Sequence, residues 1–408
     1  MPAAPALQKL TVGGQAFLRD PHARLTCALE AGPLAQTRLL VFGRITAVLS
    51  HAGITEMMKD AGRFTVDARN AGHSSALGMP FLPKSLKLLA ENLLTLDEPH
   101  HTRLRRLADA PFRRAAIEGM RPAVEAQCAR LLDEMARSGN TDLVSGLCRP
   151  LPIQVICDLL GLSDARREGL VRVFSGFSGA GTLEAIGVLM KTGWVQSELR
   201  QEFAEVRAVP RPGLITELVH AEAEDGRLTE DELLSMVFIL FAAGHETTTH
   251  FISSSVWTML TQPGAREAIA AMDGEALNVA VDELMRFSGP VQFTKPRYAR
   301  EDTEFLGQPI KRGKPVMALL AAGNLDPAAF DDPLTLNLGR RPNRHLSWGW
   351  GPHLCLGMHL AKAECEIALR QILERWPGVE IDGDPAALKW SQRPGVRGLA
   401  RLPLQLKS

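Results

Sequence analysis

Three glycines and one cysteine within a short stretch constrain this chain more than any other feature. The stretch covers residues 345–360 and holds Gly349, Gly351 and Gly357 around Cys355. Glycines at this density allow a tight turn and a close approach by another group, because they adopt positive φ and carry no Cβ. The sequence therefore predicts a compact loop that presents Cys355 to a partner.

Cys355 stands directly before an apolar, helix-compatible run from Leu356 to Arg375. At a helix N-terminus, free N–H groups and the helix dipole stabilise an anion, so we expect a thiol biased toward thiolate, the form that binds a metal. A single thiolate without a second Cys or a paired His is unsuited to zinc but suits an axial ligand of haem iron. The ordinary alternative is a buried structural cysteine.

The loop resembles the cysteine-ligand loop of the cytochrome P450 family, F-G-x-G-x-H-x-C-x-G, which is matched here by Trp348-Gly349-Trp350-Gly351-Pro352-His353-Leu354-Cys355-Leu356-Gly357. The resemblance implies a mainly α fold with a small β-rich part and a long central helix over the haem. It implies that haem b is bound with its iron ligated by Cys355. Gly349, Gly357 and Trp348 would contact the haem, and His353 would face one of its propionates.

The one departure from the family loop is Trp348, where Phe is usual. Its indole N–H is a donor that phenyl lacks, and we expect the acceptor to be the Cys355 thiolate or a loop carbonyl. A bond to the sulfur would withdraw electron density and raise the haem reduction potential. The alternative is that Trp348 is simply a larger aromatic plug.

A second motif, at residues 96–106, predicts a helix that starts at Pro99 after Asp97. His101 and Arg105 are four residues apart and share a face of this helix. A basic helix face is usually only solvated. The motif resembles the family pattern D-x-P-x-H-x-x-x-R, which implies that His101 and Arg105 hold a haem propionate.

The longest helical run extends from Leu228 to about Leu260, and Thr229 with Glu232 forms a capping box at its start. Most of the run is apolar, which predicts a buried central helix. Gly244 and a short polar stretch interrupt it, and such breaks of the local rules are typical of functional sites. A kink filled by hydroxyl groups is the alternative.

This interruption, Ala243 to Thr248, resembles the family's oxygen-activation motif A-G-x-D/E-T-T. The resemblance implies that Ala243 and Gly244 lie against the haem. It also implies that Thr247 donates a hydrogen bond to bound dioxygen and that Glu246 gates proton delivery.

Glu283 and Arg286 lie one turn apart on another predicted helix, and most such pairs are weak surface salt bridges. They match the family's E-x-x-R motif, which joins a third arginine, here best matched by Arg340, in a structural network. The next segment resembles the pocket-lining strand that sends an arginine to the second propionate. That role goes to Arg297, with Lys295 as a weaker competitor.

The segment 64–96 is too apolar for a solvated loop, and it resembles the roof of the family's substrate pocket. A loop tucked onto the core is the alternative. A glycine-rich break at 178–182 resembles the hinge of the family's substrate lid, although a plain connection between core helices fits as well. The candidate substrate contacts are apolar, and we expect a neutral hydrophobic substrate; these contacts are Leu77, Phe81, Ile239, Val291 and Phe293.

The 408 residues contain no linker or repeat, which favours one domain spanning 1–408; alternation at 37–49 and 304–316 predicts strands. Equal numbers of basic and acidic side chains, 46 each, give no reason to expect nucleic acid or an anionic membrane as a partner. Six scattered cysteines and the lack of a signal or spanning segment indicate a soluble, monomeric protein of the cytoplasm.

The resemblance implies a monooxygenase whose electrons come from a separate ferredoxin and ferredoxin reductase, since the chain shows no such module. The partner would dock on the Cys355 side, with Arg103, Arg106, Arg113 and Lys362 as candidate contacts. A peroxide-driven enzyme of the same fold, which does not need an acid–alcohol pair, is one alternative. A non-enzymatic haem sensor is the other.

Overall fold

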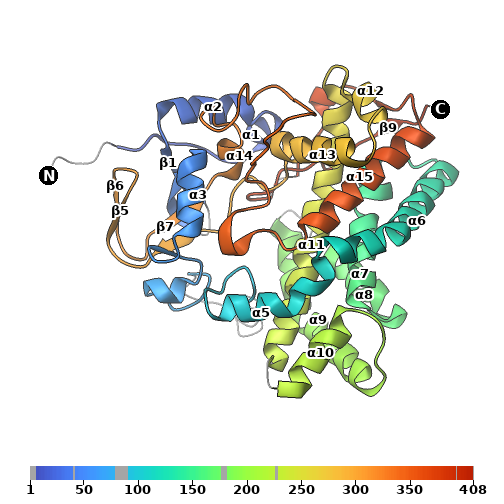
Figure 1. The fold of residues 1–408 in the computed structure, drawn as a ribbon, viewed down its shortest axis with the longest axis horizontal. Coiled ribbons are helices and arrows are strands. Elements are labelled where there is room, and N and C mark those ends of the chain that lie inside the picture. The colour runs from blue at the N-terminus through green and yellow to red at the C-terminus, as the bar shows by residue number, and fades with distance from the viewer. Residues whose placement is uncertain are drawn as a thin grey trace.

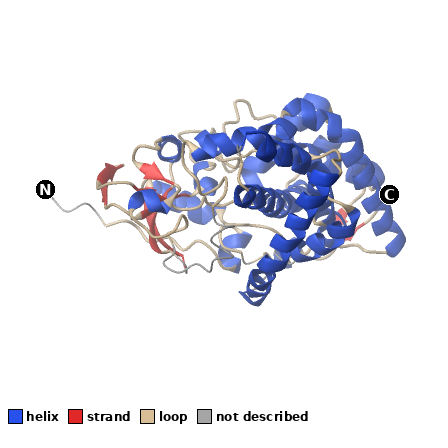
Figure 2. Cartoon of the chain, turned by 90° about the horizontal axis from the view of Figure 1, so that it is seen from below, coloured by secondary structure: helices blue, strands red, loops and turns tan. Residues whose placement is uncertain are grey.

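The computed structural model describes residues 6–39, 42–78, 91–175, 182–225, 228–391 and 393–407. Helices fill one side of the molecule and most strands gather at the other (Figures 1 and 2). The mainly α fold with a small β-rich part, predicted from the sequence, is confirmed. The described α-helices are α1 (Gln15–Arg19), α2 (His22–Ala31), α3 (His51–Lys59), α5 (His100–Asp109), α6 (Arg114–Ser138), α7 (Pro150–Leu160), α8 (Asp164–Ser175), α9 (Thr182–Ala208), α10 (Leu214–Asp225), α11 (Glu230–Thr261), α12 (Ala265–Ala270), α13 (Gly274–Ser288), α14 (Leu320–Gly323) and α15 (Met358–Arg375).

The strands form one mixed sheet and two short hairpins. The sheet has the order β1-β2-β7-β4-β3, in which β2 and β7 are parallel and the other neighbours are antiparallel. Both alternating runs identified in the sequence contribute strands. The strands are β1 (Leu34–Leu39), β2 (Gly43–Val48), β3 (Phe64–Thr65), β4 (Arg297–Ala299), β5 (Thr303–Phe305), β6 (Gln308–Ile310), β7 (Pro315–Ala318), β8 (Glu380–Ile381) and β9 (Leu404–Gln405).

Helix α11 runs through the middle of the helical part (Figure 1). The predicted capping box is present: the Thr229 hydroxyl accepts from the Glu232 N–H, and the Glu232 carboxylate accepts from the Thr229 N–H. The helix packs against α7, α13 and α15. Because neighbours cover it on several sides, most of its apolar side chains are buried, as the sequence predicts.

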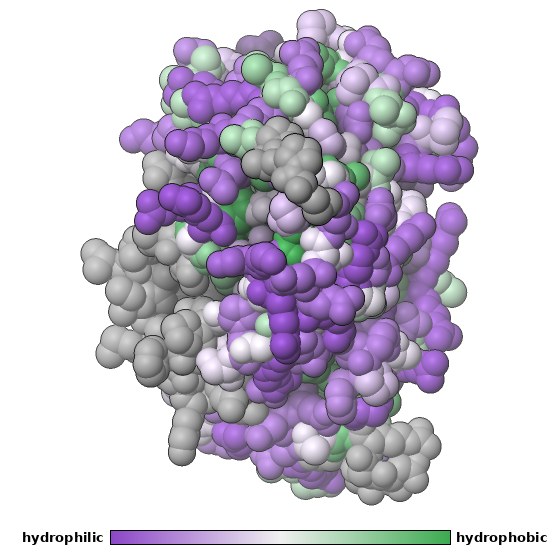
Figure 3. Space-filling view, turned by 90° about the vertical axis from the view of Figure 1, so that its left-hand side faces the viewer, coloured by the Kyte–Doolittle hydropathy of each residue, from purple (hydrophilic) through white to green (hydrophobic). Residues whose placement is uncertain are grey.

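The surface that the β-rich end presents is mostly hydrophilic where it is described (Figure 3). Within the described ranges, none of the helices combines the length and the apolar character that a membrane span requires. The six cysteines are all free thiols.

Candidate active site

The glycine-rich loop is closed by its own backbone. Gly349 has φ 76° and donates its N–H to the Leu346 carbonyl at 2.8 Å. The Cys355 N–H donates to the Trp348 carbonyl, also at 2.8 Å. Two bonds across so few residues need a left-handed turn between them, which explains the glycine.

Gly351 fixes where this loop sits. It has φ 73°, and a Cβ at this position would lie 2.9 Å from the Met58 carbonyl oxygen. That oxygen belongs to backbone at the end of α3, which cannot move aside as a side chain could. Glycine at 351 therefore lets the loop press against α3.

Cys355 lies three residues before α15 begins at Met358. Its side chain is accessible, yet desolvation raises the pKa of its thiol, so the accessible part faces an internal surface. A hydrogen bond from the Gly357 N–H and the charge of Arg105 oppose this rise without cancelling it. Burial thus opposes the thiolate bias expected from the helix N-terminus, and a bound metal ion would favour the thiolate.

Two histidines from distant segments meet beside this loop. The rings of His101, on α5, and His353 lie 4.1 Å apart at an angle of 42°. Desolvation, aided by the charges of His101 and Arg297, lowers the pKa of His353 to about 3, so its imidazole is neutral. Arg105 donates to the Pro352 carbonyl at 3.2 Å. The structure therefore gathers the two α5 residues at the loop, as the motif predicts.

Arg297, at the start of β4, is buried with 5% of its surface exposed. Among the described residues its guanidinium has no hydrogen bond or ion pair. Desolvation lowers its pKa to about 10, although the charge of Asp97 opposes the shift. A buried cation without an anion is costly, so this position is suited to an anionic ligand.

The middle of α11 carries an accessible stripe. Ala243 is exposed and Ile239 and Thr247 are half-buried, at spacings of one helical turn, while Leu240 and Phe241 beside them are buried. The Thr247 hydroxyl donates to the Ala243 carbonyl at 2.8 Å. An exposed strip in the centre of a buried helix marks a surface reserved for a ligand.

Gly244 lies beside this stripe, but a Cβ there would point toward Ile156 of α7, at an ordinary 3.5 Å. The protein itself therefore imposes no steric need for glycine at 244.

Glu246 forms an ion pair with Arg393, and their side chains are 14% and 15% exposed. Burial raises the pKa of Glu246, while the charge and hydrogen bond of Arg393 oppose the rise. No sequence pattern indicated Arg393, because it lies 147 residues from Glu246 in a loop without a helical or strand pattern.

The E-x-x-R residues meet in a buried network. Glu283 bonds Arg286 at 2.8 Å and Arg340 at 3.1 Å, and all three side chains are at most 8% exposed. The carboxylate also accepts from the Asn337 N–H at 3.0 Å and the Asn343 amide at 3.1 Å. Every part of this carboxylate is therefore paired within the protein.

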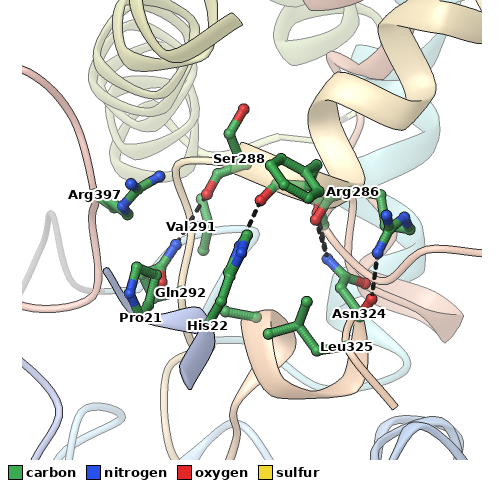
Figure 4. Close-up of a pocket in the computed structure, with 13 residues that line it drawn as sticks. Pro21, His22, Arg286, Ser288, Val291, Gln292, Asn324, Leu325 and Arg397 are labelled. Atoms are coloured by element: carbon green, nitrogen blue, oxygen red, sulfur yellow. Dashed lines mark hydrogen bonds between the residues drawn. The ribbon is translucent and has the colours of Figure 1, made fainter. Parts of the chain in front are cut away.

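Asn324 connects that network to the loop (Figure 4). Arg286 donates to its carbonyl at 2.8 Å. The Asn324 side chain accepts from the Leu346 N–H at 2.7 Å and donates to the Ser347 hydroxyl at 2.8 Å. Nothing in the sequence around Asn324 indicates these bonds, because they join segments far apart in the chain.

Trp348 does not make the hydrogen bond expected of it. Its Nε1 is buried without an acceptor among the described residues, so neither Cys355 Sγ nor a loop carbonyl is its partner. Its ring instead stands edge-on to Phe251 of α11, at 5.8 Å and 90°.

The five candidate substrate contacts lie in different surroundings. Leu77 is half-buried and its carbonyl accepts from Tyr298, while Phe81 lies outside the described residues. Val291 forms an isolated β-bridge with Val396. The Phe293 ring lies so close to Gly395 that a Cβ on that residue would clash with it. Ile239 belongs to the accessible stripe of α11. The predicted lid hinge and most of the predicted roof also lie outside the described residues.

Three of the four candidate docking residues are engaged within the chain. Arg103 pairs with Glu232, Arg113 with Asp109 and Lys362 with Asp282. Arg106 is exposed. These arginines and this lysine are thus less available to a partner than the sequence implied.

The residues fit a haem. Among the described residues no group of three His, Cys, Asp or Glu could hold a metal ion, so the donor at the loop is the single thiol of Cys355. A Cβ on Gly357, beside it, would meet nothing within 4 Å. The unpaired Arg297 and the neutral His353 supply donors for carboxylates such as the propionates.

The comparisons with known proteins agree on one family. A family model described as "Cytochrome P450" matches residues 195–385. The "Polyketide biosynthesis cytochrome P450 PksS" of Bacillus subtilis is 32% identical over 96% of this chain and 97% of its own. "Cytochrome P450 monooxygenase PikC" of Streptomyces venezuelae is 32% identical over 99% and 95%. The structure of myxobacterial CYP267B1 in complex with myristic acid matches with TM-score 0.88 at 30% identity, covering 97% of this chain and 98% of that one.

Proposed function

This chain belongs to the cytochrome P450 family, whose members bind haem through a cysteine thiolate, and we propose that Cys355 is its iron ligand in a monooxygenase acting on hydrophobic molecules. The reaction is R–H + O2 + two electrons + two protons giving R–OH + H2O. The observation that carries the proposal is Cys355 at the internal surface beside the unpaired Arg297 and the His101–His353 pair. We assign residues 1–408 to one catalytic domain.

The two carboxylates of the haem would bind to separate sets of donors. Arg105, His101 and His353 serve one propionate, since they meet at the loop. Arg297 would serve the other, because its buried guanidinium makes no ion pair among the described residues. Bound haem would supply the oxidising chemistry, and these donors would hold its carboxylates beside the loop.

Thr247 and Glu246 would deliver protons. The Thr247 hydroxyl is held by the Ala243 carbonyl on the accessible stripe, where it can pass a proton toward the haem side. Glu246 lies one residue away, and Arg393 favours its ionised form. A buried carboxylate whose pKa is raised by desolvation and whose ionised form is favoured by a neighbouring cation is suited to take up and release a proton.

The substrate and the electron source follow from different observations. The described substrate-contact candidates are apolar, and relatives are named for polyketide biosynthesis or hold myristic acid, which supports a hydrophobic substrate. We assign electron supply to a separate ferredoxin and reductase. The peroxide-driven alternative gains no support, because a retained acid–alcohol pair has no use there.

Reconstitution with a surrogate ferredoxin, its reductase and NADH tests this function. The ferrous protein should give the red-shifted carbonyl spectrum of the family, and Cys355→Ala should abolish it. Thr247→Ala should still consume NADH and oxygen but divert much of both to peroxide. A carbonyl spectrum retained by Cys355→Ala would refute the ligand, and unchanged product per NADH in Thr247→Ala would remove that residue from proton delivery.

A further inference from the structure

The C-terminal half of α11 carries a row of buried polar residues that the proposed function leaves unused. Starting from Glu246, the row takes every fourth position and consists of His250, Ser254 and Thr258. Residues four apart share one face of a helix, so the row extends directly from the proposed proton-delivery acid. Each of its three members has at most 1% of its surface exposed. Polar side chains enclosed to this degree normally have hydrogen-bond partners.

The row finds no such partners in the protein. Both ring nitrogens of His250 and the hydroxyls of Ser254 and Thr258 are buried without a hydrogen bond to any described residue. Other hydroxyls of the same helix are paired, since Thr248 and Thr249 donate to the carbonyls four residues earlier at 2.9 and 2.8 Å. The same local bond is open to Ser254 and Thr258, yet neither makes it. Their hydroxyls are therefore available to a ligand.

The loop that carries Arg393 covers part of this face of α11. A Cβ on Gly398 would clash with the His250 ring, so the ring is held against the loop backbone. One turn further along, the Trp257 ring stands edge-on to Trp390 at 5.3 Å and 82°. The Nε1 of Trp257 is also buried without a partner in the described chain. The helix and the loop thus enclose several polar atoms that they do not bond.

The chemistry of these atoms defines the ligand that would complete them. It must both donate and accept, because hydroxyls do both and because burial lowers the pKa of His250 to about 4, which keeps the imidazole neutral. A cation is disfavoured by Arg393 and Arg149, whose charges act on His250. An anion is disfavoured by the Glu246 carboxylate at the end of the row. Water meets every condition, and internal waters commonly bridge buried polar groups.

We propose that internal waters follow this row and pass protons to Glu246, and that His250 positions the water nearest that carboxylate. The inference rests on the proposed role of Glu246. Each water donates one proton toward the carboxylate and accepts one from the neighbour behind it, so the row keeps its own charge. Between Glu246 and Thr258 it spans roughly 18 Å of helix. It ends one turn before the half-buried Thr261 and Gln262, close to the solvent that supplies the protons.

The direction of a stability change tests whether water is bound. Thr258→Val replaces a hydroxyl by a methyl group of the same shape. A hydroxyl bonded to water loses that bond, so the haem-loaded variant should unfold at a lower denaturant concentration than wild type. A buried hydroxyl without any partner would gain from the same substitution. Unfolding at an unchanged or higher denaturant concentration would therefore overturn the proposal.

The matched control is Thr249→Val, which removes a buried hydroxyl of the same helix that has a protein partner. This variant should unfold at lower denaturant whether or not water is bound to the row. A crystal structure of the haem-loaded protein should also place ordered waters within hydrogen-bond distance of His250 and Ser254. Their absence from well-defined density would refute the water row.

Solvent isotope effects test whether the waters carry protons. His250→Leu removes both ring nitrogens, and we expect product formation to slow about tenfold, with a larger ratio of the rates in H2O and D2O than in wild type. His250→Gln keeps a donor and an acceptor and should restore most of the rate. Thr249→Val should keep the isotope ratio of wild type. An unchanged ratio in His250→Leu would mean that the waters only fill space, and would overturn the proton path.

Two further variants keep the test decisive. Ser254→Ala, a smaller change, should raise the isotope ratio in the same direction if His250→Leu does not fold. Glu246→Gln should slow product formation at least as much as His250→Leu. A Glu246→Gln variant as active as wild type would refute the proposed role of that acid. A slow Glu246→Gln variant beside His250→Leu and Ser254→Ala variants that behave as wild type would refute the row alone.

Discussion

The chain buries charge in two neighbouring regions and treats it in opposite ways. Around Glu283 one carboxylate meets two guanidinium groups, an amide and a backbone N–H, so all of its bonding capacity is used inside the protein. The buried guanidinium of Arg297, in contrast, makes no ion pair among the described residues, although the charge of Asp97 acts on it. Both regions bear the desolvation cost of ionised groups, and only the first recovers it within the chain.

This difference separates a structural network from a binding site. The Glu283 network ends at Asn324, which holds the backbone of Leu346 and the hydroxyl of Ser347. It therefore fixes the start of the loop that presents Cys355. The guanidinium of Arg297 lies near enough to the loop to act on His353, and a carboxylate-bearing ligand would give it an ion pair.

The largest effect on stability is expected from a substitution of Glu283, the centre of the paired network. Glu283→Gln leaves Arg286 and Arg340 buried without a counter-charge, so we expect the free energy of unfolding to fall by about 3–5 kcal/mol. Denaturant unfolding of the haem-loaded protein measures the loss. The matched control is Glu275→Gln, which breaks an exposed pair with Arg341. An equal, small effect of both variants would show that the buried network stabilises no more than a surface salt bridge.

On the ligand side the largest effect is expected at Arg297. Arg297→Met removes a charge-assisted donor from a propionate and should speed haem transfer to apomyoglobin roughly tenfold to hundredfold. Stability of the haem-free chain should not fall, because the guanidinium has no protein partner to lose. Arg297→Lys, which keeps the charge, should lie between. Unfolding of the haem-free Arg297→Met chain at lower denaturant than wild type would class Arg297 with the structural network.

The Glu246–Arg393 pair shares one property with each region: its charges are paired within the protein, and it lies at the candidate active site. Burial raises the pKa of Glu246 and Arg393 opposes the rise, so Arg393→Gln should raise that pKa further. At any pH below the new value a smaller fraction of Glu246 is ionised, and the acid limb of product formed per NADH should move to higher pH. Arg393→Lys should stay near wild type. An acid limb that does not move would exclude Glu246 titration as its cause.

The sequence predicted the parts of the site that lie within local motifs. The loop around Cys355, the α5 pair and the acid–alcohol pair of α11 each lie within one segment, so a resemblance to the family's motifs was enough to point to them. Arg393 and Asn324 could not be found this way, because their contacts join segments far apart in the chain. The desolvation that raises the pKa of the Cys355 thiol could not be predicted either, because it depends on tertiary packing, which no helix N-terminus signals.

The smallest effect is expected at Trp348. From the sequence, its indole N–H was expected to bond the Cys355 thiolate and raise the haem reduction potential. Its Nε1 has no acceptor among the described residues, and its ring packs against Phe251. A side chain that gives no hydrogen bond to the sulfur cannot withdraw charge from it by that route. Trp348→Phe should therefore leave the haem reduction potential unchanged, with at most a small loss of stability from lost packing. A potential lowered in the variant, measured by spectroelectrochemistry with haem content unchanged, would mean that the indole N–H does reach Cys355 Sγ in the loaded enzyme. Trp348 would then be a residue whose hydrogen bond forms only when the haem is bound.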